Sequence, residues 1–185
     1  MIYKSLVLTG LRRDELRTLT VSQLDLTRGG EFLQLDAGDE KSREGSSRPI
    51  REDLAADLRS WLADKLIAAQ ASARAAGNPI PERLPANALV FTVPSALVKI
   101  LDRDLKAAGV LKRDDRGRTI DVHAMRTTFG MLMIRAGVVP RTAQAAMRRS
   151  DIKLTMWVYT DPRLLNIRRA VNALPVIPLA RGERR

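Results

Sequence analysis

Cysteine is absent from the 185 residues and histidine occurs once, at His123. The absence of cysteine excludes disulfides, zinc–thiolate sites and thiol catalysis, and a single histidine excludes a multi-histidine metal site. Aromatic residues make up only 4% of the chain, and no basic amphipathic segment with an aromatic-rich face is present, so binding to a membrane surface is not favoured. No apolar run approaches transmembrane length, and residues 1–8 are too short for a signal peptide. We therefore expect a cytoplasmic protein without membrane contact.

Positive charge is the strongest compositional signal. Lysine and arginine number 32 against 21 acidic residues, which gives a net charge of +11 and a sequence pI near 10.9. Such an excess indicates a polyanionic partner, because neutralised phosphates release condensed counterions. A basic protein without a nucleic-acid role stays open at this point, since net charge does not say how the charges cluster. The apolar content of 45% predicts a folded chain with a real core rather than a disordered one.

The residue pattern predicts one mostly α-helical domain over residues 1–185 with a small antiparallel β-sheet, an α+β arrangement that ends in a basic tail at 175–185. Two segments are expected to form the strands of a hairpin: residues 31–36, in which apolar and polar residues alternate, and the short extended segment 48–50. The tip between them is long and covers residues 38–47. Pro49 predicts an edge strand, because proline has no amide donor. Periodicity and turn residues predict the helices. Their expected ranges are 1–8, 12–18, 52–75, 94–108, 123–136, 140–148, 153–159 and 163–173.

Several residues could carry chemistry, although none is specific alone. His123 and Arg126 lie three residues apart on one expected helix and share a face; as an isolated pair they could equally be a capping histidine and a solvated arginine. Arg12 follows the turn at Gly10, and a local ion pair with Glu15 would explain it as well. Tyr159 could be a half-buried aromatic residue or a nucleophile, and by default Lys41 is a solvated loop lysine.

The order and spacing of these residues change that balance, because together they resemble the tyrosine recombinases, the phage integrase family. Thr9-Gly10-Leu11-Arg12-x-x-Glu15-Leu16 is similar to the segment that carries the family's first catalytic arginine. His123-Ala124-Met125-Arg126 is similar to its histidine-x-x-arginine box, and Val158-Tyr159-Thr160-Asp161 to its nucleophile segment. Lys41 lies eight residues before Pro49, as the family's hairpin lysine precedes its strand proline. The resemblance extends over most of the chain, from Leu6 to about Leu165.

The resemblance implies a role for each residue. Arg12 and Arg126 would hold the non-bridging oxygens of the scissile phosphate. Tyr159 would attack the phosphorus to form a 3′-phosphotyrosine, and Lys41 would protonate the leaving 5′ oxygen. His123 would hydrogen-bond the phosphate or relay the tyrosine's proton. The reaction would need neither a metal nor another cofactor.

Two positions depart from the family pattern. Arg149, ten residues before Tyr159, occupies the place where most members have a second histidine. An arginine can donate to a phosphate oxygen but cannot exchange a proton near neutral pH. Thr127 stands where a histidine commonly follows the box. We predict that Arg149 contacts phosphate; its alternative is an arginine at a site that has lost activity.

The resemblance also implies partners and alternatives. Double-stranded DNA is the expected substrate, and relatives assemble as homotetramers on DNA by docking a C-terminal segment on a neighbour, for which the apolar and basic residues 174–185 are a candidate. The family's N-terminal core-binding domain is expected to be absent, because only about eight residues precede the first catalytic segment. A catalytically impaired DNA-binding remnant is the main alternative, and a type IB topoisomerase-like enzyme or a helical DNA-binding regulator is weaker.

Overall fold

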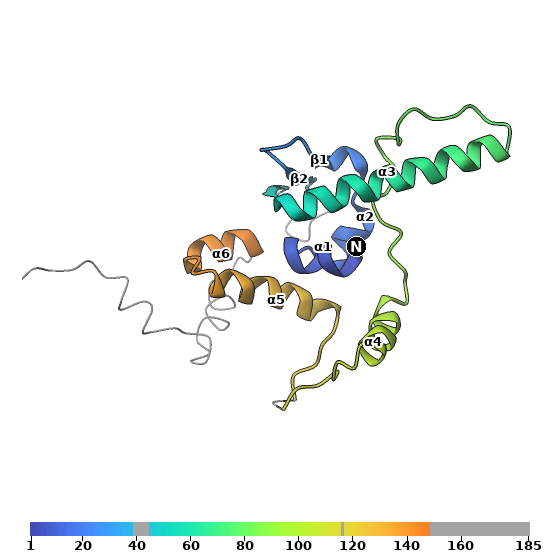
Figure 1. Ribbon diagram of the computed structural model, residues 1–185. Helices are drawn as coiled ribbons and strands as arrows, with labels where there is room; N and C mark the ends of the chain where they lie inside the picture. Colours follow the sequence, from blue (N-terminus) through green and yellow to red (C-terminus); the bar gives the residue numbers. More distant parts are fainter. Residues whose placement is uncertain (39–44, 116, 149–185) are drawn as a thin grey trace, which may run out of the picture.

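The computed structural model describes residues 1–38, 45–115 and 117–148 (Figure 1). Within them the fold is mostly helical with one small antiparallel sheet, as the sequence predicts. The elements are α1 (Ile2–Thr9), α2 (Arg13–Thr18), a 3-10 turn η1 (Val21–Gln23), β1 (Leu24–Asp25), β2 (Phe32–Leu35), β3 (Ser46–Pro49), α3 (Glu52–Ala75), α4 (Leu97–Ala107), α5 (Val122–Arg135) and α6 (Pro140–Met147). The helices expected at 153–159 and 163–173 and the tail at 175–185 lie outside the described residues.

The sheet has three strands in the order β1-β2-β3, with both pairs antiparallel. Pro49 faces Phe32 from β3, which is an edge strand of the described sheet, so the edge prediction for Pro49 is confirmed. Two expectations were wrong. β1 was not predicted, because two residues are too few to show alternation. Ser46 and Ser47 were expected in the hairpin tip, but they belong to β3 and pair with Leu35 and Gln34 of β2.

Helix α1 lies between α3 and α5 and packs against both (Figure 1). It ends at Gly10, whose backbone is left-handed with φ 62° and whose amide donates to the carbonyl of Leu6 at 3.0 Å. A β-carbon at Gly10 would lie 2.5 Å from Cδ1 of Phe129 on α5. The close approach of α5 therefore requires glycine at this turn. Leucines from α1, α2 and the following turn form the buried core beneath it: Leu6, Leu11, Leu16 and Leu19.

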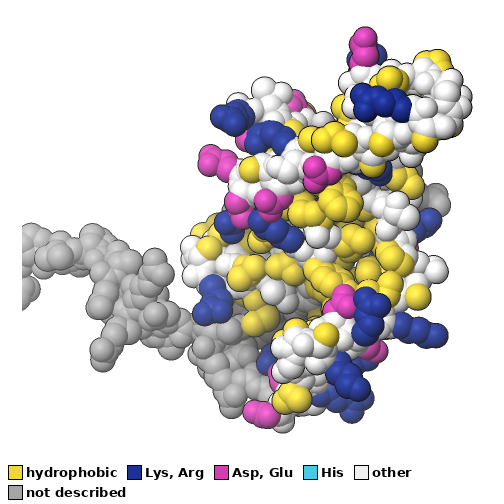
Figure 2. Space-filling view, turned by 45° about the vertical axis from the view of Figure 1, so that its right-hand side comes forward, with side chains coloured by type: hydrophobic (Ala, Val, Ile, Leu, Met, Phe, Trp, Pro, Cys, Tyr) yellow, Lys and Arg dark blue, Asp and Glu magenta, His cyan; other side chains and the backbone are white. Residues whose placement is uncertain are grey.

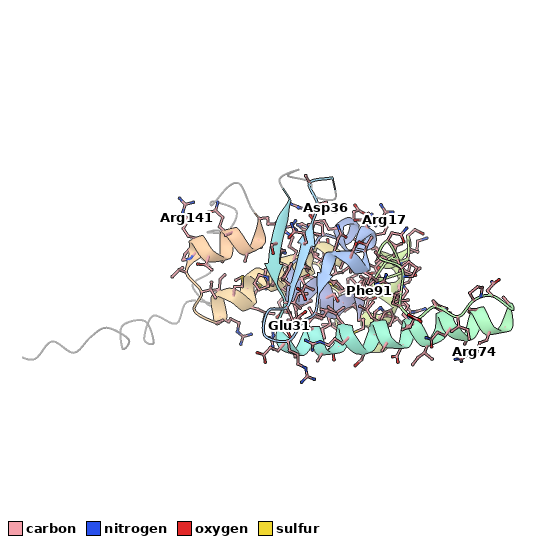
Figure 3. The ribbon with its side chains drawn as sticks, turned by 90° about the horizontal axis from the view of Figure 1, so that it is seen from above. Arg17, Glu31, Asp36, Arg74, Phe91 and Arg141 are labelled. Carbon is pink, nitrogen blue, oxygen red and sulfur yellow. The ribbon has the colours of Figure 1, made fainter. Side chains whose placement is uncertain are left out.

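Helix α3 supports the sheet at one end and extends beyond the rest of the molecule at the other (Figures 1 and 3). Arg59 on α3 forms an ion pair with the buried Glu31 beside β2. The predicted helix is confirmed, but its apolar stripe is buried only in the first half: Leu58 is 3% exposed and Ile67 is 62% exposed. Hydrophobic side chains also gather on the face between α3 and α4 (Figure 2).

Helix α4 begins at Leu97 and not at Pro94, the start that the sequence predicts. The amide of Leu97 donates to the carbonyl of Pro94 at 3.2 Å, so a single turn precedes the regular helix. Leu97 and Leu101 are its buried residues. In the part of the chain that is described, no helix is both long and apolar enough to cross a membrane.

Candidate active site

Arg12 and Glu15 form the first part of the site, at the start of α2. Arg12 precedes the helix in an extended conformation, and its amide donates to Oε2 of Glu15 at 2.8 Å. Its guanidinium Nη1 donates to Oε1 of the same carboxylate at 2.7 Å. The local ion pair that the sequence allows is therefore present. The Arg12 side chain keeps 30% of its surface exposed, whereas that of Glu15 keeps 3%.

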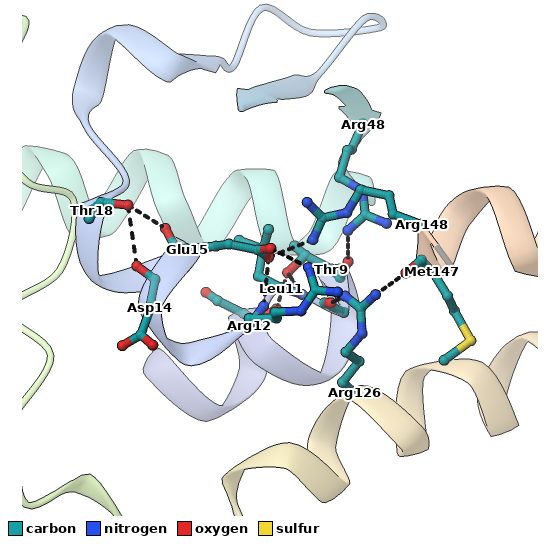
Figure 4. A network of polar contacts seen from close by, with 12 residues as sticks. Thr9, Leu11, Arg12, Asp14, Glu15, Thr18, Arg48, Arg126, Met147 and Arg148 are labelled. Carbon is teal, nitrogen blue, oxygen red and sulfur yellow. Dashed lines mark hydrogen bonds and ion pairs between the residues drawn. The ribbon is translucent and has the colours of Figure 1, made fainter. Parts of the chain in front are cut away.

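Arg126 joins three elements from within the protein. It lies on α5, is only 3% exposed, and donates to the carbonyls of Gly10 and Met147 (Figure 4). Gly10 ends α1 and Met147 ends α6, so one guanidinium holds α5 to both helix ends. Arg48 on β3 donates to the neighbouring carbonyl of Thr9. The turn before Arg12 is thus held by two buried arginines.

Arg148 completes the cluster from the end of α6. Its Nη2 donates to Oε2 of Glu15, and its side chain is 9% exposed. Figure 4 shows the guanidinium groups of Arg12, Arg48, Arg126 and Arg148 gathered near this one carboxylate. The sequence predicts Arg12 and Arg126 but not Arg48, Glu15 or Arg148 as parts of the site. Only Arg149 lies at the position of a family site residue, so the sequence pattern gives no signal for the preceding Arg148.

The cluster carries more positive than negative charge in a buried setting. Burial first, and then the charges of Arg12 and Arg148, lower the pKa of Arg126 to about 9, while Glu15 opposes the shift. Like charges gathered in a poorly solvated region repel one another. An anion that enters the cluster would relieve this repulsion, so the site favours a phosphate or a similar group.

An apolar cavity of about 570 Å³ borders the cluster between α1, β3, α5 and α6. Arg48 and Arg148 contribute to its wall, together with Phe129 and Met133 of α5. Apolar walls reduce the screening of nearby charges. None of the described residues that line the cavity is acidic, so its wall offers these arginines no counter-charge.

Glu15 makes stability depend on pH. Burial raises its pKa, but hydrogen bonds from Arg148 and Arg12 outweigh burial, and the pKa lies below the ordinary value of 4.5. A carboxylate whose pKa is lower in the folded than in the unfolded state stabilises the fold at pH values above its unfolded pKa, and this contribution is lost as pH falls through the folded value.

We expect the free energy of unfolding, measured by urea titration, to fall as pH drops below about 4.5. Glu15→Gln should reduce this dependence more than Glu82→Gln, which replaces an exposed glutamate; equal slopes would contradict the assignment.

The other predicted residues are not brought into the described cluster. His123 is exposed on the first turn of α5, whereas Arg126 on the next turn is buried. Lys41, Arg149 and Tyr159 lie outside the described residues. Across residues 1–38, 45–115 and 117–148, no three histidine or acidic side chains gather to form a metal site.

Solved structures share the fold. XerA recombinase superposes with a TM-score of 0.64 at 19% identity, over 93% of this chain and 57% of that one. The Tn1549 transposon integrase in complex with transposon right end DNA gives 0.61 at 20% identity, over 92% and 57%. The catalytic domain of bacteriophage HP1 integrase gives 0.57 at 18%, over 95% and 81%. This chain thus spans little more than half the length of the first two proteins.

The fold is that of the catalytic domain of tyrosine recombinases. The family model described as "Phage integrase family" matches residues 1–164. The chain therefore belongs to the phage integrase family, and the resemblance read from its motifs is confirmed. A sequence comparison with curated proteins found no match.

Proposed function

We propose that residues 1–185 form the catalytic domain of a site-specific DNA recombinase or integrase. The domain would break and rejoin double-stranded DNA through a transient 3′-phosphotyrosine. The observation that carries this proposal is the cluster of four arginines around Glu15, in which Arg12 is partly exposed. Excess positive charge fixed in a buried network suits the extra negative charge of a pentacoordinate phosphate.

The chemistry follows from the residue types. The oxygen of Tyr159 attacks the phosphorus, a phosphorus–oxygen bond to tyrosine forms, and the bond to the 5′ oxygen breaks. Lys41 gives that oxygen its proton, and His123 accepts or relays the proton of the tyrosine. Attack of a 5′ hydroxyl on the phosphotyrosine reverses these steps and rejoins the strand. The arginines supply the positive charge, so no metal is needed.

The geometry separates the two arginines that the family motif treats alike. Arg12 is the partly exposed one and is the first to meet a phosphate that arrives from solvent. Arg126 is buried and already binds two backbone carbonyls. We infer that Arg126 contributes its charge and the shape of the site, while Arg12 makes the outer contact. Arg149 would add a further contact to the phosphate.

A catalytically impaired DNA-binding remnant is the second candidate. It is favoured by Arg149 in place of the usual histidine and by the engagement of Arg126 with Gly10 and Met147. Both candidates bind DNA, so only strand cleavage separates them. If Arg149→His creates cleavage where the natural chain has none, the remnant is the better description. Assembly as a tetramer on DNA through residues 174–185 belongs to the first candidate.

The test is covalent capture. The full chain is incubated at low salt, which favours phosphate contacts, with a randomised pool of short nicked DNA duplexes, and protein–DNA adducts are resolved on a denaturing gel. We expect an adduct with the natural chain and none with Tyr159→Phe, because phenylalanine lacks the attacking oxygen. An adduct that survives this substitution would overturn the choice of nucleophile. DNA retention without any adduct would support the remnant.

The chain offers a matched control. Its other tyrosine, Tyr3, donates its hydroxyl to Asp104 at 2.9 Å and lies outside the arginine cluster. Tyr3→Phe removes the same atom from the same residue type. Adduct yield should therefore stay close to that of the natural chain, and a loss equal to that of Tyr159→Phe would point to a general effect on folding.

A further inference from the structure

Arg148 has an unusual backbone for its residue type. It follows α6 in a left-handed conformation, with φ 48° and ψ 50°, and is the one non-glycine residue with positive φ in the described part of the chain. Glycine is the usual residue at such a helix end, because a β-carbon disfavours this conformation. Arg148 thus bears a backbone cost that glycine would not, and its side chain forms a contact that glycine could not form.

The side chain of Arg148 ends on a carboxylate that also holds Arg12. Oε2 of Glu15 accepts from Nη2 of Arg148 and from the amide of Arg12, and Oε1 accepts from Nη1 of Arg12. Arg148 therefore adds a third hydrogen bond to the carboxylate that holds both the amide and the guanidinium of Arg12.

Burial makes this restraint effective. The side chains of Glu15 and Arg148 are 3% and 9% exposed, so water competes little for their contact. The side chain of Arg12, at 30% exposed, reaches the surface. The buried Arg148 is thus linked through the carboxylate of Glu15 to Arg12, whose guanidinium is partly exposed to solvent.

We propose that Arg148 is a positioning residue that orients Arg12 toward phosphate through Glu15. This inference rests on the proposed function for its catalytic consequence, but the restraint on Arg12 exists without it. In this proposal Arg148 acts through Glu15 and not by its own contact with the phosphate. Its contribution is to keep Arg12 in one direction before DNA arrives, which avoids reorganisation during the reaction.

The first experiment measures the restraint without any activity. The chain of residues 1–185 is treated with phenylglyoxal, which modifies accessible guanidinium groups, and modification of Arg12 is followed by mass spectrometry. Arg148→Gly suits the left-handed backbone but removes the guanidinium, so Arg12 should be modified several-fold faster than in the natural chain. Arg141→Ala removes an exposed arginine from the same helix, pointing away from the cluster (Figure 3), and should leave the Arg12 rate unchanged. An unchanged rate in Arg148→Gly would overturn the proposal.

The second experiment tests the consequence for cleavage. At saturating DNA, Arg148→Gly should slow adduct formation about tenfold to a hundredfold, as expected for one misplaced contact, with DNA affinity nearly unchanged. Arg148→Lys should recover part of the rate. In a Glu15→Gln background, Arg148→Gly should have little further effect, because the link to Arg12 is already broken.

The outcomes are distinguishable. Additive losses from Arg148→Gly and Glu15→Gln would show that Arg148 acts independently of Glu15 and would overturn the proposal. A loss of folded protein would lower adduct yield but not the rate of the remaining fraction. If the natural chain forms no adduct, the proposed function fails, while the phenylglyoxal rates still decide whether Arg148 restrains Arg12.

Discussion

Gly10→Ala is expected to lower the free energy of unfolding by about 2–5 kcal/mol, the sum of a backbone and a packing contribution. The left-handed backbone at φ 62° costs an L-residue roughly 1–2 kcal/mol. The added β-carbon would lie 2.5 Å from the ring of Phe129, so α1 and α5 must move apart or the ring must turn. Such overpacking adds about 1–3 kcal/mol. Urea unfolding followed by circular dichroism measures the loss.

Gly137→Ala is the matched control for the backbone contribution. Gly137 follows α5 with φ 78°, but an added β-carbon would meet no atom within 4 Å. Only the backbone cost of roughly 1–2 kcal/mol should appear there. Equal losses at the two glycines would contradict the packing contribution. Phe129→Leu should restore part of the stability in the Gly10→Ala background and none in the Gly137→Ala background, because only Gly10 contacts this ring.

Gly10→Ala should also impair the arginine cluster of the candidate active site. The carbonyls of Thr9 and Gly10 accept from Arg48 and Arg126, so a shifted turn misplaces both guanidinium groups. Arg12 follows the turn by two residues and would move with it. The family motif places a glycine before the first arginine, and the contact with Phe129 supplies a physical reason for glycine in this chain.

Local patterns were sufficient to predict most of the fold. α3 and α6 match their expected ranges closely, because apolar spacing and Pro140 at the first turn are signals contained within the helix. The two residues of β1 and the delayed start of α4 were missed. β1 depends on contacts with other parts of the chain: it pairs with β2, and the residues just before it form hydrogen bonds with residues 86–90. At α4, the residues after Pro94 form a single turn before the regular helix begins.

The site was predictable only where motifs name residues. Arg12 and Arg126 were found by their resemblance to family segments, and the structure places them together although they are far apart in sequence. Arg48 and Arg148 have no such signal, since a basic chain with 32 lysines and arginines offers many equivalent candidates. Glu15 appeared in the motif, but its link to Arg148, 133 residues away, exists only in the folded chain.

Arg126→Lys is expected to reduce stability and to abolish most cleavage, although it preserves formal charge. The fork of Arg126 reaches the carbonyls of both Gly10 and Met147, and a single ammonium group cannot reproduce that geometry. One buried carbonyl left without its donor costs about 1–3 kcal/mol. Because loss of this contact shifts the turn that carries Arg12, the adduct rate should also fall by about a hundredfold. Urea unfolding and single-turnover capture measure the two effects.

Arg135→Lys on the same helix is the control, because Arg135 is exposed in the last turn of α5. It should change neither stability nor rate, and an equal effect at both positions would contradict a special role for Arg126.

The pH dependence of the adduct rate further separates the loss of charge at position 126 from the loss of the guanidinium fork. Burial and neighbouring arginines lower the pKa of Arg126 to about 9, and the same surroundings act on lysine from an ordinary pKa roughly two units lower. Part of the lysine at position 126 should therefore be uncharged near neutral pH. Since acidification recharges it, the residual adduct rate of Arg126→Lys, relative to that of the natural chain, should rise as pH is lowered from about 8 to about 6. A constant ratio across this range would show that the missing fork, and not the missing charge, accounts for the whole loss.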